Sequence, residues 1–285
     1  MRSKSQNYQL RENERMTLFN RLMVAATAAW AFQACATTPP AAAHADDTTH
    51  IYLAADSTAA DHTLNADYWE NRHPVTGWGQ KLEPFVNGDS LEALRPLIKG
   101  DRVNVVNRAR GGRSTRTFFE EGRWERIDED LKPGDLVLIQ FGHNDAAVNK
   151  TERYVTVEGY KQYLRLFIDQ TRARGATPIL MTPVARNYPW EDGQLINDHG
   201  EYDDAAREVA MQEGVEWIDL QERSKAFFSN KGEEYVSETY FMNLPAGTFS
   251  AYPDGQDDNT HFQPEGAEAV ARLVYEGLKD IADTH

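Results

Sequence analysis

Residues Asp135 to Phe141 read DLVLIQF, an apolar run of strand length that opens at a Gly-Asp pair. A continuous apolar run bounded by turn residues is typical of a strand buried on both faces of a parallel sheet. Arg102 to Asn107 (RVNVVN) follows another Gly-Asp pair and shows a similar pattern. We therefore expect both runs to be strands buried on both faces of one parallel sheet.

Further strands and helices alternate along the chain on either side of these runs. Apolar residues recur at helical spacing between the strands, and Gly175 is a stop signal for the helix that precedes it. The alternation predicts an α/β protein, a three-layer α/β/α sandwich with five parallel strands and its ligand site beyond their carboxyl ends. The added strands are expected at His50–Ala54, Thr177–Thr182 and Val215–Leu220, and helices at Val157–Arg174, Asp203–Glu213 and Gly266–Ile281.

Composition narrows the functional class. The 285 residues are 40% hydrophobic and 26% charged, which suits a folded domain and argues against a disordered chain. Asp and Glu number 45 against 30 Lys and Arg, giving a formal charge of -15, so nucleic acid is not an expected partner. With one Cys, no disulfide can form within the chain.

The first 45 residues resemble an export signal followed by a linker. Arg21 precedes the apolar run Leu22–Phe32, as in a secretory signal that starts at Met1 or at Met16. Cys35 then lies in a stretch resembling a lipoprotein cleavage box, whereas Ala43-His44-Ala45 offers an ordinary cleavage site. We expect residues 46–285 to be exported from a bacterial cell, with Cys35 as a candidate lipid anchor and soluble secretion as the alternative. The destination is then the periplasm, the outer membrane or the extracellular space.

Four short polar fragments fall where a parallel sheet would bring them to one edge. Three of them follow predicted strands, and the fourth precedes the last predicted helix. Each fragment alone is a common turn or cap, but together they hold every group that a serine esterase needs. The fragments are Asp56-Ser57, Gly111-Gly112-Arg113-Ser114, Gly142-His143-Asn144-Asp145 and Asp258-Asn259-Thr260-His261.

Each group in these fragments has a predicted role. Ser57 supplies the hydroxyl nucleophile and its own N–H, and His261 is the base that takes the hydroxyl proton. Asp258 lies three residues before His261, so a helix-like turn would let its carboxylate orient the imidazole. Gly112 can bring its N–H close to the substrate because it has no Cβ, and Asn144 adds a side-chain N–H to the same oxyanion hole.

Two of these fragments also have other interpretations. Asp56 is adjacent to the nucleophile and points elsewhere in an extended segment, so a capping role for its carboxylate is favoured over catalysis. The His, Asn and Asp of residues 142–145 superficially suggest a metallophosphoesterase. However, no Asp-x-His follows the first strand to supply its first metal ligands. No metal and no cofactor are therefore expected.

The fragments resemble the SGNH (GDSL-type) hydrolases, and within them the rhamnogalacturonan acetylesterases. The resemblance rests on Asn107–Trp124, on Phe141–Asp145 (FGHND) and on Tyr252–Phe262. It implies a flavodoxin-like sheet, the roles given above for the predicted site residues, and removal of acetyl groups from plant cell-wall polysaccharide without a metal. One departure is that Ala55 stands where the family usually has the Gly of Gly-Asp-Ser.

The substrate is less narrowly predicted than the reaction. Arginines beside the proposed oxyanion loop could attract a galacturonate-containing chain, but pairing with nearby acidic residues on a helix surface is at least as good an explanation. Acetylated rhamnogalacturonan or pectin is the preferred substrate. Acetylxylan or another glycan, a long-chain ester for a lipase or thioesterase, and a non-catalytic glycan-binding role stay open. The arginines are Arg110, Arg113, Arg116, Arg123 and Arg126, facing Glu120, Glu121, Glu125 and Asp128.

Aromatic residues and two polar loops are further candidates for the rim of the site. An aromatic ring can stack on a sugar, although burial at the base of a loop is the commoner explanation. The aromatic residues are Trp69, Trp78, Tyr188 and Trp190, and the loops are Tyr188–Gly200 and Thr239–Asn259.

Overall fold

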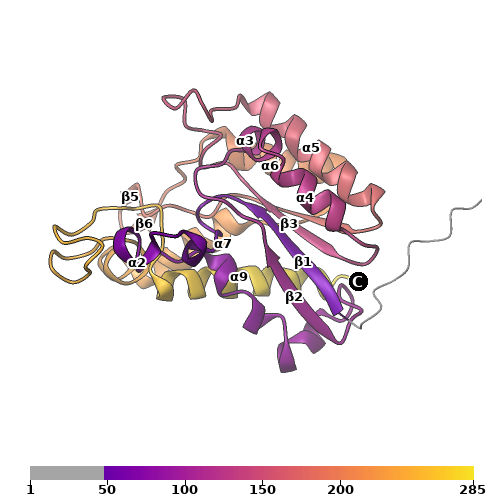
Figure 1. Ribbon diagram of the computed structural model, residues 1–285, viewed down its shortest axis with the longest axis horizontal. Helices are drawn as coiled ribbons and strands as arrows, with labels where there is room; N and C mark the ends of the chain where they lie inside the picture. The colour runs from indigo at the N-terminus through magenta and orange to yellow at the C-terminus, as the bar shows by residue number, and fades with distance from the viewer. Residues whose placement is uncertain (1–47) are drawn as a thin grey trace, which may run out of the picture. The chain divides into compact units, whose positions relative to one another are not determined.

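A five-stranded parallel sheet in the order β2-β1-β3-β4-β7 forms the centre of the protein (Figure 1). The computed structural model describes residues 48–285, so the predicted signal segment, linker and Cys35 lie outside the described residues. The predicted parallel sheet and its five strands are confirmed, and no end of a strand differs from its predicted position by more than two residues. The strands are β1 (Thr48–Ala55), β2 (Arg102–Asn107), β3 (Leu136–Gln140), β4 (Thr177–Met181) and β7 (Glu216–Ile218).

The order of the strands puts β1 and β3 side by side, and the connections that leave these two strands run to opposite sides of the pair. From β1 the chain passes to β2 on one side, and then returns to the other side of β1 to add β3, β4 and β7 in turn. When the connections after two neighbouring parallel strands run in opposite directions, a crevice forms at the carboxyl ends of those two strands. The segments that follow β1 and β3 therefore enter one shared crevice.

The burial of β2 differs from the prediction. The apolar run predicts a strand buried on both faces, but β2 is an edge strand in which only Val103 is buried. The valines that suggested an interior strand also favour an edge strand, because β-branched residues suit any half-buried pleated surface. By contrast, every residue of β3 is buried, as its apolar run predicts.

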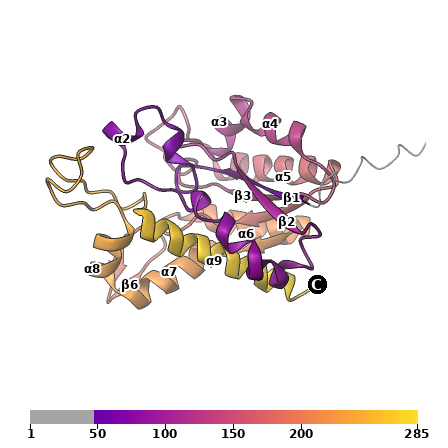
Figure 2. The ribbon, with the colours of Figure 1, turned by 60° about the horizontal axis from the view of Figure 1, so that its bottom comes forward.

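Helices cover both faces of the sheet, so the predicted three-layer sandwich is confirmed (Figures 1 and 2). The two hydrophobic cores lie on opposite faces, and each unites alternate residues of the strands with the helices above or below them. On one face lie α3 (Thr115–Glu120), α4 (Arg123–Asp130), α5 (Val157–Ala173) and α6 (Glu201–Glu213). On the other lie α7 (Leu220–Lys231) and α9 (Pro264–Ala282).

Capping residues explain where the predicted helices begin. The side chain of Thr156 accepts a hydrogen bond from the Gly159 N–H at the start of α5, and Pro264 occupies the first turn of α9. Sequence reasoning did not anticipate α7, or the small hairpin within the predicted loop Tyr188–Gly200. The hairpin and the remaining short helices are β5 (Trp190–Glu191), β6 (Gln194–Leu195), α2 (Tyr68–Asn71) and α8 (Glu233–Tyr235).

Candidate active site

Ser57 lies in a tight turn directly after β1. The backbone oxygen of Asp56 accepts hydrogen bonds from the N–H groups of Ala59 (3.4 Å) and Ala60 (3.2 Å), which closes the turn. The Asp56 carboxylate is fully buried and accepts from the Thr58 N–H (2.9 Å) and hydroxyl (2.8 Å). Asp56 thus braces the turn that presents Ser57, which is the capping role favoured from the sequence.

The side chain of His143 keeps the buried Asp56 ionised. Burial by itself raises the pKa of this carboxyl, but His143 and the hydrogen bonds from Thr58 outweigh it, so the pKa of Asp56 is lowered. The Nδ1 atom of His143 lies 3.1 Å from the Asp56 carboxylate, and the His143 backbone oxygen accepts from Arg186 at 3.3 Å. His143 therefore links the turn after β1 to the segment after β4.

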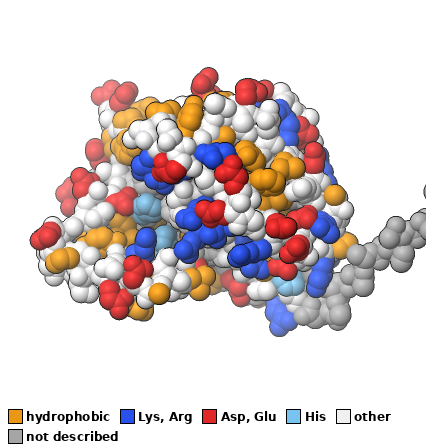
Figure 3. All heavy atoms as spheres, turned by 45° about the horizontal axis from the view of Figure 1, so that its top comes forward, with side chains coloured by type: hydrophobic (Ala, Val, Ile, Leu, Met, Phe, Trp, Pro, Cys, Tyr) orange, Lys and Arg blue, Asp and Glu red, His pale blue; other side chains and the backbone are white. Residues whose placement is uncertain are grey.

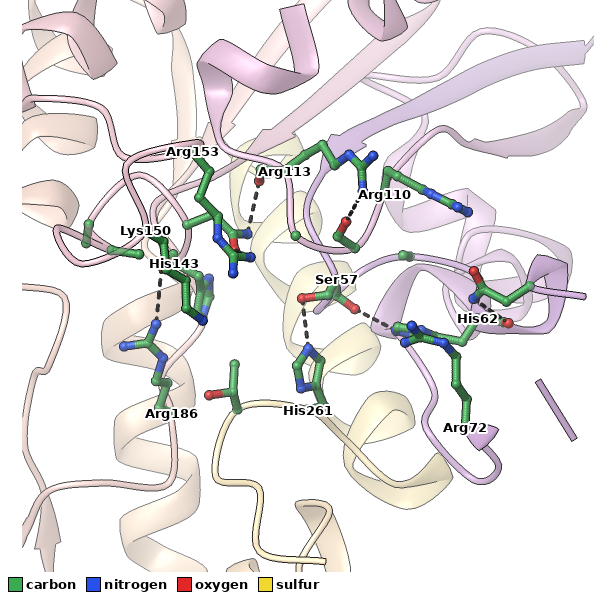
Figure 4. A pocket seen from close by; sticks show the side chains of 18 of the residues that line it. Ser57, His62, Arg72, Arg110, Arg113, His143, Lys150, Arg153, Arg186 and His261 are labelled. Carbon is green, nitrogen blue, oxygen red and sulfur yellow. Dashed lines mark hydrogen bonds between the residues drawn. The ribbon is translucent and has the colours of Figure 1, made fainter. Parts of the chain in front are cut away.

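Ser57, His261 and Asp258 form one hydrogen-bonded row, and Figure 4 shows the contact between Ser57 and His261. The Nε2 atom of His261 is 2.9 Å from the Ser57 hydroxyl oxygen, and its Nδ1 atom is 2.7 Å from an Asp258 carboxylate oxygen. Because the carboxylate can only accept, Nδ1 carries the proton and Nε2 presents a lone pair to the hydroxyl. This arrangement can take the proton of Ser57 when the hydroxyl attacks a carbonyl carbon.

The backbone of residues 258–261 is not the helix-like turn that the spacing suggested. One carboxylate oxygen of Asp258 accepts from the backbone N–H groups of Thr260 (2.9 Å) and His261 (3.0 Å), and the other faces the imidazole. The aspartate thus folds the chain around its own side chain, as Asx turns do. Burial alone would raise the pKa of Asp258, but the interactions with His261 and the backbone N–H groups outweigh burial and lower the pKa to about 2.

The predicted oxyanion donors meet at the same place. Neither the Ser57 N–H nor the Gly112 N–H donates to any group in the described part of the chain, and both residues line the cavity above the row. Gly112 has a φ of +78°, a conformation that favours glycine, and a Cβ there would lie 3.3 Å from the Arg153 guanidinium. Two free N–H groups beside a nucleophile can hold an oxyanion.

Arg153 sets the orientation of the third predicted donor, Asn144. An Arg153 nitrogen donates to the Asn144 side-chain oxygen at 3.0 Å, and the Asn144 amide nitrogen donates to the Arg113 backbone oxygen at 3.0 Å. A guanidinium can only donate and a carbonyl can only accept, so these two contacts allow one orientation of the amide. That orientation leaves the second N–H of the Asn144 side chain for a ligand.

Asp145, the residue after Asn144, anchors the loop that follows β3. Asp145 is fully buried, and one of its oxygens accepts from the Thr115 hydroxyl (2.6 Å) and N–H (3.0 Å) at the start of α3. Burial raises the pKa of Asp145 to about 7 despite these hydrogen bonds. The contact joins the loop after β3 to the loop after β2, which together carry Asn144 and Gly112.

His62 is a site residue that sequence reasoning missed. Its Nε2 atom lies 2.8 Å from the Ser57 backbone oxygen, and its ring stands edge-on to that of His261 with centroids 6.3 Å apart. Burial lowers the pKa of His62 to about 4, so near neutral pH the ring is uncharged and donates its one N–H to Ser57. The sequence carried no signal for this role, because a single His in a polar turn is common.

The row opens into a cavity of about 640 Å³ whose wall is rich in cations (Figures 3 and 4). Three of the cations have a partner: Arg113 pairs with Glu121, Arg186 pairs with Asp198, and Arg153 donates a hydrogen bond to Asn144. The other three have no acidic partner among residues 48–285, and the acidic residues of the wall are Asp61 and Asp198. The cations are Arg72, Arg110, Arg113, Lys150, Arg153 and Arg186.

The predicted arginine cluster divides between the two explanations. Arg116 pairs with Glu120 at 3.1 Å, and Arg113 and Arg123 share Glu121, so these three follow the helix-surface pairing that was the favoured reading. Arg110 and Arg113 both line the cavity (Figure 4), and of these two Arg110 has no acidic partner among residues 48–285. The cations from residues 72, 150, 153 and 186 were not anticipated, because they come from separate loops.

The predicted aromatic residues also differ in their positions. Trp78 is fully buried and donates its indole N–H to Gln140 at 2.9 Å, so it belongs to the core. Trp69 is 67% exposed and stacks on His73. Tyr188 is 44% exposed, and Trp190 is half-buried, with its indole N–H donating to Asn187.

Among residues 48–285, no group of three or more His, Cys, Asp or Glu side chains is arranged to hold a metal ion. None of the helices in this range has the length and apolar character needed to cross a membrane.

Comparison with known proteins gives the family. Residues 76–269 match the GDSL-like Lipase/Acylhydrolase family. The chain is 42% identical to "Probable rhamnogalacturonan acetylesterase YesY" of Bacillus subtilis over 81% of its own length and 93% of the relative's. It is 37% identical to "Rhamnogalacturonan acetylesterase RhgT" of the same organism, over 81% of its length and 90% of the relative's.

Solved structures agree on the fold. The chain resembles the YXIM protein of Bacillus subtilis with a TM-score of 0.64 and 28% identity, covering 82% of this chain and 57% of that one. An acetylxylan esterase from Geobacillus stearothermophilus matches at a TM-score of 0.54 and 17% identity, over 81% and 94% of the two chains, which bears on the fold alone. From its family match and its relatives, the chain belongs to the GDSL-like lipase/acylhydrolase family and is a carboxylic ester hydrolase.

Proposed function

We propose that this protein removes O-acetyl groups from plant cell-wall polysaccharide, with acetylated rhamnogalacturonan as its substrate. The observation that carries the proposal is the row of Ser57, His261 and Asp258 at the base of a cation-lined cavity. Two relatives that match most of this chain are named rhamnogalacturonan acetylesterases, which supports the same substrate class.

The first half-reaction transfers the acetyl group to Ser57. The Ser57 hydroxyl oxygen attacks the acetyl carbonyl carbon while His261 takes the hydroxyl proton at Nε2. The carbonyl oxygen becomes an oxyanion, which the N–H groups of Ser57, Gly112 and Asn144 stabilise. The bond between the carbonyl carbon and the sugar oxygen then breaks, and His261 returns its proton to that oxygen. The products are the free sugar hydroxyl and the acetyl-enzyme.

The second half-reaction releases acetate. A water molecule gives one proton to His261 and attacks the acetyl carbon, and the same N–H groups hold the second oxyanion. The bond to the Ser57 oxygen breaks, and the proton on His261 returns to that oxygen. Asp258 stays ionised throughout and holds Nδ1 protonated, so each cycle ends with the starting tautomer.

The charge of the cavity favours an anionic chain over a neutral one. Arg72, Arg110 and Lys150 have no acidic partner among the described residues, although the chain as a whole carries a formal charge of -15. Cations on a concave surface attract and orient carboxylates. Galacturonate residues supply such carboxylates next to the acetylated hydroxyl groups, whereas an unsubstituted xylan backbone supplies none.

Acetate release should distinguish these substrates. We expect faster release, by kcat/KM, from acetylated rhamnogalacturonan than from acetylated xylan, and little release of long acyl chains from nitrophenyl esters. Replacing Arg72 and Arg110 together by glutamine should raise KM for rhamnogalacturonan about thirtyfold, since two lost charge-assisted contacts of about 1 kcal/mol each weaken binding by about 2 kcal/mol.

The comparison needs Ser57→Ala in parallel, to subtract acetate that is released without the enzyme. A preference for acetylated xylan, undiminished when the two arginines are replaced, would overturn the rhamnogalacturonan assignment and leave a xylan esterase. Efficient hydrolysis of long-chain esters would instead point to a lipase or thioesterase. No acetate release, with binding of the polysaccharide unaffected by Ser57→Ala, would point to a non-catalytic glycan-binding protein.

Activity should decline on the acid side as His261 takes up a proton, because the imidazole must start neutral to act as the base. With a pKa lowered to about 2, Asp258 remains ionised through this range. With a pKa lowered to about 4, His62 remains uncharged above pH 5. The measurement is kcat/KM for nitrophenyl acetate from pH 4 to 9, and a rate that stays flat down to pH 4 would contradict this base.

Asp145 needs its own control, since its pKa is raised to about 7 and its protonation falls in the same range. The Asp145→Asn variant removes this ionisation, and its fold can be checked by circular dichroism. If the acid decline belongs to His261, the variant keeps it at the same pH. A decline that disappears in the variant would assign it to Asp145.

The substrate class also fits the export that we propose for residues 1–45, because plant cell-wall polysaccharide lies outside the bacterial cell. Both the signal segment and the candidate lipid anchor at Cys35 remain proposals from the sequence.

A further inference from the structure

A second cavity, of about 510 Å³, adjoins the active-site cavity. Neighbouring residues of the chain line the two in turn: Thr260 and His261 line the first, and Asn259 lines the second. A second segment also lies between the two cavities and forms the other side of this partition, because Arg186 lines the first cavity and Tyr188 lines the second. A polymer bound with one residue at Ser57 therefore has a second recess beside it.

The two cavities differ in charge. No Lys or Arg of the described chain lines the second cavity, and its charged residues are Glu233 and Asp257. The rest of its wall consists of amide, hydroxyl and aromatic side chains, among them Gln256 and Ser237. Carboxylate oxygens accept hydrogen bonds from sugar hydroxyl groups but repel a uronate. The second cavity therefore suits an uncharged sugar.

Two aromatic rings give this cavity surfaces on which a sugar can pack. Tyr188 is held at the partition by Arg186, whose Cζ atom lies 5.9 Å from the ring centroid and whose Nη1 lies 3.4 Å from the phenol oxygen. The indole N–H of Trp190 donates to the Asn187 backbone oxygen at 3.2 Å and side-chain oxygen at 3.1 Å, which fixes the orientation of that ring. Aromatic faces bury the C–H groups of a sugar, and of a deoxysugar most of all.

Other polar groups of the cavity are already committed to the structure. Asn187 and Asn243 each donate to the Asn259 side-chain oxygen at 2.8 Å, and the Asn243 side-chain oxygen accepts from the Asp258 N–H at 2.9 Å. These contacts hold the loop that carries Asp258. The side chains of Gln256 and Glu233 make no hydrogen bond within residues 48–285, so they remain for a ligand beside the rings of Tyr188 and Trp190.

We propose that the second cavity is a binding subsite for an uncharged sugar, of the deoxyhexose type, next to a uronate that occupies the cationic cavity. This inference rests on the proposed esterase function and adds to it. The enzyme would read a polymer in which charged and neutral sugars alternate, by placing each in a recess of matching charge. Such a subsite discriminates rhamnogalacturonan from a chain made of galacturonate alone.

The test measures two reactions on each variant. The first is hydrolysis of nitrophenyl acetate, which is too small to reach the second cavity. The second is inhibition of that hydrolysis by acetyl-free rhamnogalacturonan oligosaccharides of increasing length, alongside galacturonate oligosaccharides of equal length. For Tyr188→Ala we expect about tenfold weaker inhibition by the long rhamnogalacturonan oligosaccharides, because the ring surface is lost. The loss should be small for galacturonate oligosaccharides.

Two matched variants separate a subsite from general damage. Tyr188→Phe keeps the ring and should retain most of the inhibition. Phe119→Ala removes an exposed aromatic ring that lines neither cavity, so it should leave inhibition by both kinds of oligosaccharide unchanged. Equal loss in Phe119→Ala and Tyr188→Ala, or no loss in Tyr188→Ala, would overturn the subsite. Failure of the wild type to hydrolyse nitrophenyl acetate would instead overturn the esterase function itself.

A charge reversal tests the proposed preference for an uncharged sugar. Glu233→Lys places a cation at the edge of the second cavity, and we expect it to strengthen inhibition by galacturonate oligosaccharides several-fold relative to rhamnogalacturonan oligosaccharides. The effect should shrink at high salt, because the attraction is screened. An unchanged ratio of the two inhibition constants would contradict the assignment of an uncharged sugar to this cavity.

Discussion

Replacing Ser57 by alanine should lower kcat for acetate release on the order of 10⁵- to 10⁶-fold, the size of effect seen when a serine hydrolase loses its nucleophile. The Ser57 hydroxyl lies 2.9 Å from Nε2 of His261, and no other hydroxyl of residues 48–285 is hydrogen-bonded to that nitrogen. Removing it leaves the oxyanion donors in place but no atom to form the acetyl-enzyme. Acetate release from polysaccharide and from nitrophenyl acetate should fall together.

The matching test is His261→Ala, alone and combined with Ser57→Ala. Because the two residues act as one unit, the double variant should be about as slow as either single variant. Thermal unfolding of Ser57→Ala should stay close to that of the wild type, since the hydroxyl makes no contact that the fold requires. Multiplying losses in the double variant, or substantial activity in Ser57→Ala, would remove Ser57 from the reaction.

The second large effect is expected for Asp258→Asn, with a loss in kcat of about 10⁴-fold. One Asp258 oxygen accepts from the backbone N–H groups of Thr260 and His261, so the oxygen of an asparagine would keep that position. The amide nitrogen would then face Nδ1 of His261 and donate to it. The imidazole would carry its proton on Nε2, and it could no longer accept the proton of Ser57.

Asp254→Asn provides the control, because it makes the same chemical change at an exposed position of the same loop. It should leave kcat and KM near their wild-type values. Loss of activity in Asp258→Asn should appear in kcat more than in KM, because the imidazole acts on the reacting atoms and not on substrate binding. A loss confined to KM, or a loss in the control of similar size, would assign Asp258 a structural role.

Local pattern was sufficient for most of the fold. The apolar runs that predict β1, β3 and β4 and the periodicity that predicts α5 and α9 depend on neighbouring residues alone, and all five elements are present. The same information does not say which strand lies at an edge. Arg102–Asn107 forms β2 as predicted but is only partly buried, because the strand order decides how many neighbours a strand has.

The candidate site divides in a similar way. Ser57, Gly112, Asn144, Asp258 and His261 could be named because each lies in a short segment whose composition suits its proposed role. The turn around Asp258 could not be predicted, since three-residue spacing fits a helical turn and an Asx turn equally well. His62 and Arg153 gave no signal, because their contacts with Ser57 and Asn144 are visible only in three dimensions.

Local patterns are enough to predict the alternation of strands and helices, the parallel sheet, and the residues from which a serine esterase could be built. They do not predict that Ser57 and His261, 204 positions apart, come within 2.9 Å, or that cations from separate loops surround them. The two kinds of information differ in the distance along the chain over which they act. Backbone preference and hydrophobic periodicity act within a few residues, whereas a cavity and its charge arise only when the packing of the sheet brings distant loops to one edge.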